Sequence, residues 1–196
     1  MRQGSHRLGL LMAPWFLLVL QVSAQGTEPT LQDTMNFIAS ALNSRGTISW
    51  TETIPDVFGA SYTVNSSLAK VNADSSACSL SWTSVYTSSD DKLIETYLVN
   101  LGTVSNVDVQ PFSRYRKSAF QFKFEVSPET YIVVIKTDAS LAGSRELYHK
   151  NKPKPQTEAW NDREARLQFS DEQAANTVSD RIRHAAKICA GTRSGR

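Results

Sequence analysis

Histidine is scarce in this sequence of 196 residues, which contains three in all. After the first 24 residues only His149 and His184 remain, and neither has a neighbour at a spacing that would position it as a catalytic base. Serine is abundant, but the sequence has no G-x-S-x-G motif and no glycine-rich phosphate loop. We therefore expect no catalytic residue.

Metal-binding motifs are missing as well. The sequence has no H-E-x-x-H motif, and its two cysteines lie far apart. The Asp90-Asp91 pair could contact a hard cation, but a pair of this kind is more simply an ordinary turn. We expect neither a metal site nor a cofactor.

The only long hydrophobic run lies at the N terminus. Arg2 and Arg7 open the chain, and residues 8–20 are nearly all apolar but too short to span a membrane. Val22-Ser23-Ala24 supplies small residues at the cleavage positions, so residues 1–24 are predicted to be a secretory signal peptide cleaved near Ala24. The alternative is an uncleaved anchor. After cleavage we expect an exported protein, periplasmic or secreted, with no transmembrane segment.

An excess of one charge is also missing once the signal peptide is removed. Residues 1–24 carry two arginines and no acidic residue, so nineteen basic and nineteen acidic residues remain. This balance gives no indication of a nucleic-acid partner. The remaining length suits one domain, which we place at residues 30–191, between a leader at 25–29 and a flexible tail at 192–196.

The clearest structural pattern is a long helix near the C terminus. Ser170 and Gln173 form a capping box at its start, and Gly191 is placed to cap its end. Apolar residues follow one face at steps of three and four: Ala174, Val178, Ile182, Ala185 and Cys189. The small residues among them predict that this closing helix packs closely on a flat surface.

The rest of the chain is predicted to supply that surface. A short amphipathic helix capped by Thr30 comes first, and apolar and polar residues then alternate as in strands. Strands are predicted at residues 47–51, 62–71, 78–86, 93–99, 104–109, 120–126, 131–135 and 166–169. Of these, 120–126 and 131–135 form the clearest hairpin, with 131–135 covered on both faces, and residues 141–163 are predicted to be a long exposed loop.

The fold class that follows is α+β. We expect a single curled antiparallel sheet or a partly open barrel of about seven or eight strands. A short N-terminal helix and a long C-terminal closing helix complete the domain.

The order of these elements resembles a pleckstrin-homology-like domain, in which one C-terminal helix closes a curled antiparallel sheet. The helix entry Phe169-Ser170-Asp171-Glu172-Gln173-Ala174 and the exit His184-Ala185-Ala186-Lys187-Ile188-Cys189 are also similar to the closing helix of small exported bacterial proteins of unassigned function. The extra leading helix departs from the pleckstrin-homology pattern, and no phosphoinositide-binding motif is carried over. A helix-grip fold of the START type is the rival resemblance, and neither fold by itself defines a function.

Two basic clusters in predicted loops are candidate contact sites. The first is Arg114, Tyr115, Arg116 and Lys117, and the second is Tyr148, His149, Lys150, Lys152 and Lys154, with Trp160 nearby. If the loops meet at one end of the sheet, they form an anion-attracting rim for a protein, a glycan or a small ligand. The alternative is that the charges are simply solvated and the aromatic side chains hold the loops in place.

The two cysteines, Cys78 and Cys189, are predicted to form a disulfide, because an exported protein enters an oxidising compartment. The alternative is two separate buried thiols. Asn65-Ser66-Ser67 is in addition a glycosylation sequon, which matters only in a eukaryotic host.

Two functions of different kinds remain open. The first is an exported non-catalytic binding or interaction module with an unknown ligand. The second is a helix-grip carrier or enzyme with an apolar cavity under the C-terminal helix, lined by residues such as Trp82, Phe120, Phe122 and Phe124, whose simpler role is core packing. A cavity beneath that helix would favour the second function, and a filled core would favour the first.

Overall fold

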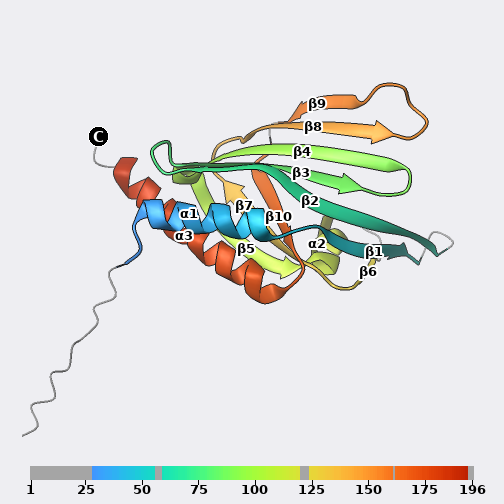
Figure 1. Ribbon diagram of the computed structural model, residues 1–196, viewed down its shortest axis with the longest axis horizontal. Coiled ribbons are helices and arrows are strands. Elements are labelled where there is room, and N and C mark those ends of the chain that lie inside the picture. Colours follow the sequence, from blue (N-terminus) through green and yellow to red (C-terminus); the bar gives the residue numbers. More distant parts are fainter. Residues whose placement is uncertain (1–27, 56–58, 120–123, 161, 194–196) are drawn as a thin grey trace, which may run out of the picture.

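The computed structural model describes residues 28–55, 59–119, 124–160 and 162–193. Over these residues the fold is α+β, with three α-helices and ten strands in two antiparallel sheets (Figure 1). The fold class and the helices at its two ends are as predicted. The predicted signal peptide, the first part of the leader and residues 120–123 of a predicted strand lie outside the described residues.

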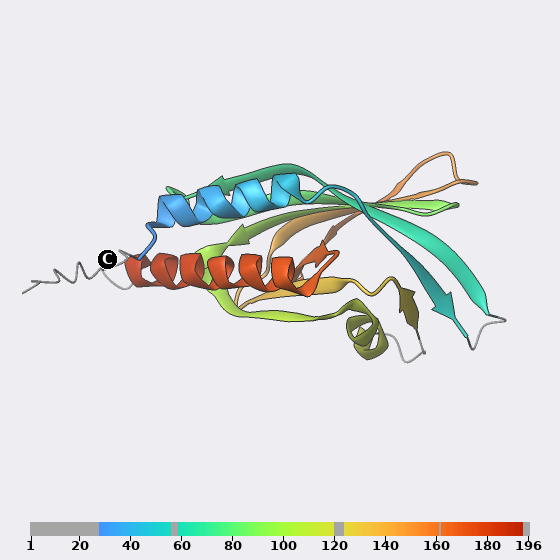
Figure 2. The same ribbon diagram turned by 60° about the horizontal axis from the view of Figure 1, so that its bottom comes forward.

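The large sheet has seven described strands in the order β6-β1-β2-β3-β4-β8-β9. They are β1 (Ile48–Ile54), β2 (Ala60–Asp74), β3 (Ser79–Thr87), β4 (Asp91–Asn100), β6 (Glu125–Ser127), β8 (Ala142–His149) and β9 (Gln156–Trp160). Alternate residues of β4 are buried on one face of the large sheet. The other face carries hydroxyls such as those of Thr83 on β3 and Thr96 on β4, which lie opposite each other. Figure 2 shows β1 and β2 bending at their far end, so that the sheet is strongly curved.

The small sheet has the order β10-β7-β5, formed by β5 (Val104–Pro111), β7 (Tyr131–Thr137) and β10 (Glu164–Phe169). A short 3₁₀ helix, η1 (Leu101–Thr103), leads into β5. In the central strand, Val133 and Ile135 join one apolar cluster, and Ile132 and Val134 join another. This confirms that β7 is covered on both faces, which is why its apolar residues are consecutive rather than alternate.

The predicted hairpin between residues 120–126 and 131–135 is wrong. β6, the described end of the first segment, pairs with β1 at the edge of the large sheet, with Val126 opposite Glu52. β7 pairs instead with β5 and β10 in the small sheet. The turn between the two segments therefore carries the chain from one sheet to the other, and it divides the ten strands between two sheets.

The predicted exposed loop at residues 141–163 is also wrong. β8 and β9 occupy most of this segment and extend the large sheet beyond β4, with Arg145 opposite Glu95. The proline and lysine residues that indicated a loop lie in the turn between the two strands. The strands were missed because β8 is mostly polar and β9 is an exposed edge strand, so neither shows a strong apolar alternation.

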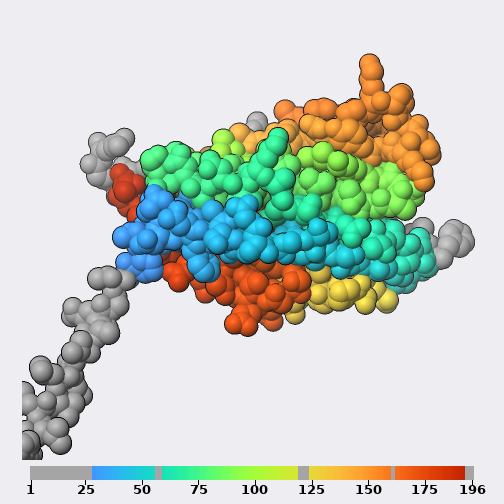
Figure 3. Space-filling model, viewed as in Figure 1, coloured from blue at the N-terminus to red at the C-terminus, as the bar shows by residue number. Residues whose placement is uncertain are grey.

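The N-terminal helix α1 (Leu31–Ser44) begins where its sequence predicts. The Thr30 side chain accepts a hydrogen bond from the backbone N–H of Asp33 at 3.1 Å, as an N-cap does. Met35, Ile38 and Leu42 are buried along its inner face. Figure 3 shows α1 in blue beside the red-orange α3 on one face of the molecule.

The closing helix α3 (Glu172–Arg193) is longer than predicted at its end and begins at a different cap. Asp171, rather than Ser170, caps it, because the Asp171 carboxylate accepts the backbone N–H of Ala174 at 2.8 Å. The helix continues through Gly191 instead of ending there.

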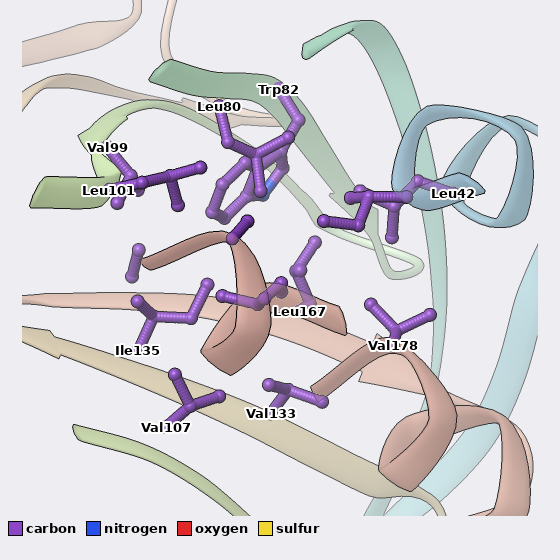
Figure 4. Close-up of a cluster of buried hydrophobic side chains, with 14 of the residues drawn as sticks. Leu42, Leu80, Trp82, Val99, Leu101, Val107, Val133, Ile135, Leu167 and Val178 are labelled. Atoms are coloured by element: carbon purple, nitrogen blue, oxygen red, sulfur yellow. The ribbon is translucent and has the colours of Figure 1, made fainter. Parts of the chain in front are cut away.

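Apolar side chains fill the space beneath α3. Figure 4 shows Leu80 and Trp82 of the large sheet, Ile135 of the small sheet and Val178 of α3 pointing into one cluster. The predicted stripe is buried from Val178 through Ile182 and Ala185 to Cys189, with Ala174 partly buried. Burying a residue of the size of isoleucine contributes about 1.5 to 3 kcal/mol, so α3 is an integral part of the core.

A disulfide links Cys78 to Cys189, with their Cα atoms 5.8 Å apart, which confirms the predicted pairing. Cys78 directly precedes β3, and Cys189 is the last buried residue of the α3 stripe. The bond therefore ties the end of the closing helix to the large sheet across 111 positions of sequence.

Candidate functional site

An open cleft of about 580 Å³ lies between the two sheets. Its walls come from α2 (Phe112–Ala119), from β1, β2, β3, β4 and β8 of the large sheet, and from β7 and β10 of the small sheet. Apolar side chains such as Trp50, Leu93, Ile132 and Leu147 line much of it. Residues of α1 and α3 do not line this cleft, so it is separate from the core beneath the closing helix.

Helix α2 occupies the segment around Tyr115 that was predicted to be a loop, and this correction matters for the cleft. Near the start of the helix, the Glu129 carboxylate accepts the backbone N–H of Ser113 at 3.1 Å, where the helix dipole favours a negative charge. Phe112, Tyr115 and Arg116 follow at the i, i+3 and i+4 spacing and line the cleft together. The prediction failed because the helix is short and mostly polar, and its apolar stripe has only two aromatic residues.

Glu52 is a buried carboxylate at the β1 side of the cleft, with an exposed fraction of 3%. Its Oε1 accepts the indole N–H of Trp50 at 3.0 Å, and its Oε2 accepts the Tyr62 hydroxyl at 2.8 Å. The Arg116 guanidinium of α2 lies 2.7 Å from the same Oε2. These three donors compensate the desolvation of the carboxylate, and they connect the large sheet to α2.

Glu95 is the equivalent buried carboxylate on β4, also 3% exposed. Arg145 of β8 donates to its Oε1 from Nε at 3.1 Å and from Nη2 at 2.8 Å, and the Tyr97 hydroxyl donates to its Oε2 at 2.7 Å. Both Glu95 and Arg145 line the cleft. The pairing with two guanidinium donors fixes the orientation of the Arg145 side chain.

A third guanidinium reaches the cleft from the small sheet. Arg166 of β10 donates to the Asp162 carboxylate at 3.2 Å and lies 5.7 Å from the centroid of the Tyr115 ring. The Tyr115 ring stacks on Phe112, with centroids 6.3 Å apart, and Phe112 meets Trp50 edge to face at 5.4 Å. Cation–π and aromatic contacts of this kind fix the side chains of β10, α2 and β1 relative to one another.

Arg45, in the loop after α1, holds the backbone of β10 at a residue that lines the cleft. Its guanidinium donates to the backbone carbonyl of Gln168 and, at 3.2 Å, to the Ser66 hydroxyl. The Gln168 amide in turn donates to the Thr130 hydroxyl at 2.7 Å. Burial lowers the pKa of Arg45 to about 10, so Arg45 remains positively charged at neutral pH.

The tyrosines of the cleft remain neutral far above neutral pH. Burial raises the pKa of Tyr86 to about 12 and raises the pKa values of Tyr62 and Tyr115 in the same direction. An unfolded tyrosine ionises near about pH 10. The stabilisation that comes from a protonated Tyr86 is therefore complete below about pH 10 and is lost as the pH rises through about 12.

Tyr86 is expected to lower the free energy of unfolding by roughly 1 to 3 kcal/mol between about pH 10 and pH 12. Arg45, whose pKa is lowered, contributes in the opposite direction over the same range, so the Tyr86 contribution is measured as the difference between wild-type protein and Tyr86→Phe. Urea unfolding of both proteins at a series of pH values gives this difference. The same pH profile in Tyr86→Phe and in wild type would show that Tyr86 does not titrate in this way.

The structure separates the residues of the first predicted cluster. Tyr115 and Arg116 line the cleft, whereas Arg114 and Lys117 are exposed on the other side of α2. Two residues of the first cluster therefore belong to the cleft, and the other two lie on the solvent-exposed surface.

The second predicted cluster lies at the β8–β9 end of the large sheet and does not meet the first. Figures 1 and 2 show the β8–β9 turn and α2 well apart in both views. Lys150, Lys152 and Lys154 are exposed in this turn, Tyr148 and His149 end β8, and Trp160 ends β9.

The residues of the second cluster contact acidic side chains of β8 and of the turn and strand beside it. His149 Nδ1 lies 2.6 Å from the Asp91 carboxylate, and Lys150 lies 3.7 Å from that of Asp90. The Tyr148 hydroxyl donates to Glu146 at 2.7 Å. The condition for a single anion-attracting rim, that the two clusters meet at one end of the sheet, is therefore not fulfilled.

Four charged residues of the cleft were missed by sequence reasoning: Glu52, Glu95, Arg145 and Arg166. The signal was a charged residue on the inward side of an alternating strand. Glu52 follows Ile48 and Trp50 at steps of two, and Glu95 precedes Tyr97 in the same way. A charge at such a position must be paired when it is buried, but the sequence does not indicate its partner.

Comparisons with protein-family models, with curated proteins and with solved structures give no match for this chain. The resemblance to pleckstrin-homology-like domains therefore stays a prediction. Within the described ranges, no helix is long and apolar enough to cross a membrane. Nor do the residues of those ranges bring three or more histidine, cysteine or acidic side chains together as a metal site.

Proposed function

We propose that this protein is an exported non-catalytic binding module and that the cleft between its two sheets is the ligand site. The observation that carries the proposal is an open cleft of about 580 Å³, which lies outside a filled core and has a volume typical of small-molecule sites. Aromatic and aliphatic side chains supply contact area, and a few fixed polar groups such as Arg116 and Arg145 supply orientation.

The alternative, a helix-grip carrier or enzyme, requires an apolar cavity under the C-terminal helix. Buried side chains occupy the space beneath α3, including Trp82, Leu167 and Ile182. The cleft is lined by other elements, without residues of α1 or α3, and contains buried charges. A second open pocket, of about 400 Å³, lies between α1 and the first turns of α3 rather than inside the core. The binding module is therefore the better explanation of the cleft between the sheets.

Export is part of the proposal. The disulfide between Cys78 and Cys189 supports an oxidising compartment, because disulfides are rare in reducing cytoplasm. The sequence of residues 1–24 supplies the predicted signal for export.

The test uses N-phenyl-1-naphthylamine, a neutral aromatic probe whose fluorescence rises in apolar surroundings. We expect wild-type protein to bind it and Leu93→Trp to bind it at least about tenfold more weakly, because the larger side chain occupies part of the apolar space that the probe needs. Leu147→Trp, which replaces the residue directly opposite Leu93 on β8, should have the same effect.

The matched control is Leu98→Trp, on the same strand but on the opposite face, where Leu98 is 48% exposed. This variant should bind the probe like wild type. If the probe binds equally well to Leu93→Trp, Leu147→Trp and Leu98→Trp, the cleft is not its site. If the wild-type protein does not bind the probe, the proposed function is not supported.

A further inference from the structure

The arginines of the cleft come from three separate elements and converge on one space. Arg116 belongs to α2, Arg145 to β8 and Arg166 to β10, and all three line the cleft. Two of the elements belong to different sheets, so only the folded chain brings these cations together.

The guanidinium groups are nearer to solvent than the carboxylates that hold two of them. The side chains of Arg116 and Arg145 are 23% and 34% exposed, whereas those of Glu52 and Glu95 are 4% and 3% exposed. Arg166 is 22% exposed. Arg116 and Arg145 therefore lie nearer the cleft surface than the carboxylates that hold them. Asp162, the partner of Arg166, is 37% exposed, and Asp91, which also lines the cleft, is paired with His149.

A stability argument alone does not account for these buried ion pairs. Charges taken out of water lose hydration, and well-packed apolar residues in their place are often as stable or more stable. The carboxylates of Glu52 and Glu95 instead fix the direction of Arg116 and Arg145 by direct hydrogen bonds. Guanidinium groups oriented in this way are suited to carboxylate, sulfate and sulfonate groups, which match their planar set of donors.

The surface beside the arginines is apolar and aromatic. Phe112 and Tyr115 stack on one side, and Leu93, Leu147 and Ile132 line the sheets. A ligand with a charged head alone would leave this surface exposed to water. An apolar body attached to the head would cover it.

We infer that the cleft is selective for a small anionic amphiphile, an organic acid whose carboxylate, sulfate or sulfonate group contacts Arg116, Arg145 and Arg166 and whose apolar body lies on the aromatic wall. This inference rests on the proposed function, because it names the ligand class of the same cleft. The cleft volume of about 580 Å³ accommodates such a molecule.

The experiment compares two probes of nearly the same shape. 8-Anilino-1-naphthalenesulfonate carries a sulfonate, and N-phenyl-1-naphthylamine is its neutral counterpart. We expect wild-type protein to bind the sulfonate at least about tenfold more tightly, and this preference should shrink as salt is raised from about 0.05 to about 0.5 M.

Two variants assign the preference to the arginines. Glu95→Gln combined with Arg145→Gln removes the buried ion pair as a unit, and it should lower the ratio of sulfonate affinity to neutral-probe affinity about five- to tenfold. Arg166→Gln removes the third guanidinium, whose partner Asp162 is partly exposed, and it should act in the same direction. The control is Lys152→Gln, which removes one positive charge at an exposed position outside the cleft and should have no effect. The melting temperature of each variant verifies that it is folded, because the sulfonate also binds partly unfolded protein.

The outcomes separate the two claims. Equal affinity for both probes, with binding of both lost in Leu93→Trp, would leave the proposed function standing and overturn the selectivity for anions. A sulfonate preference that is unchanged in both arginine variants would overturn the role of these residues. Failure of both probes to bind wild-type protein would overturn the cleft as a site for small ligands altogether.

Discussion

Ile182→Asp is expected to unfold the protein or to lower its melting temperature drastically. Ile182 is fully buried in the core, where α3 packs on the small sheet and shares an apolar cluster with residues of the large sheet. A carboxylate at this position would lose its hydration without gaining a partner, which costs several kcal/mol. Because a typical domain is stable by only about 5 to 15 kcal/mol, this loss is a large part of the total. Thermal unfolding followed by circular dichroism measures it.

The matched control is Asn176→Asp, which introduces the same side chain on the exposed side of the same helix. It should change the free energy of unfolding by no more than about 0.5 kcal/mol. A wild-type melting temperature for Ile182→Asp would mean that α3 does not pack on the sheets as the structure shows.

Loss of the disulfide is expected to have the second-largest effect, about 4 to 5 kcal/mol in the free energy of unfolding. The bond between Cys78 and Cys189 spans 111 positions, and the chain-entropy model assigns this value to a loop of about that length. Urea unfolding of oxidised and reduced wild-type protein compares the two states without changing any side chain. A count of free thiols in denatured, unreduced protein should give none.

A double Cys78→Ala, Cys189→Ala variant provides the control for the chemistry of reduction. It should match the reduced wild-type protein, apart from the small packing loss at the buried Cys189 position. Equal urea midpoints for the oxidised protein, the reduced protein and this variant would show that packing alone holds the end of α3.

Local patterns predicted the elements with strong periodicity and failed for the weak ones. The α1 cap at Thr30, the apolar stripe through Ile182 and the doubly covered strand β7 were all visible as runs or steps of apolar residues. By contrast, α2 and β8 were missed because mostly polar sequences carry little periodic signal, and their conformation depends on neighbours supplied by the rest of the fold.

Pairing between distant segments was harder to predict than the segments themselves. β6 and β7 are close in sequence and lie in segments with clear strand patterns, yet they belong to different sheets, because β6 pairs with β1 and β7 pairs with β5 and β10. Strand pairing depends on which distant strand buries the matching face, and one chain segment contains no information about its partner's position.

The sequence by itself determined the α+β class, the two terminal helices, most of the strands and the pairing of the only two cysteines, because these follow from periodicity, caps and an even number of thiols. The tertiary structure alone decided that the strands divide into two sheets and that an open cleft lies between them. It also brought Arg116, Arg145 and Arg166 together from elements far apart in the chain. The physical reason is that apolar periodicity is a local property of a segment, whereas a cleft and the partners of its buried charges exist only after distant segments have packed.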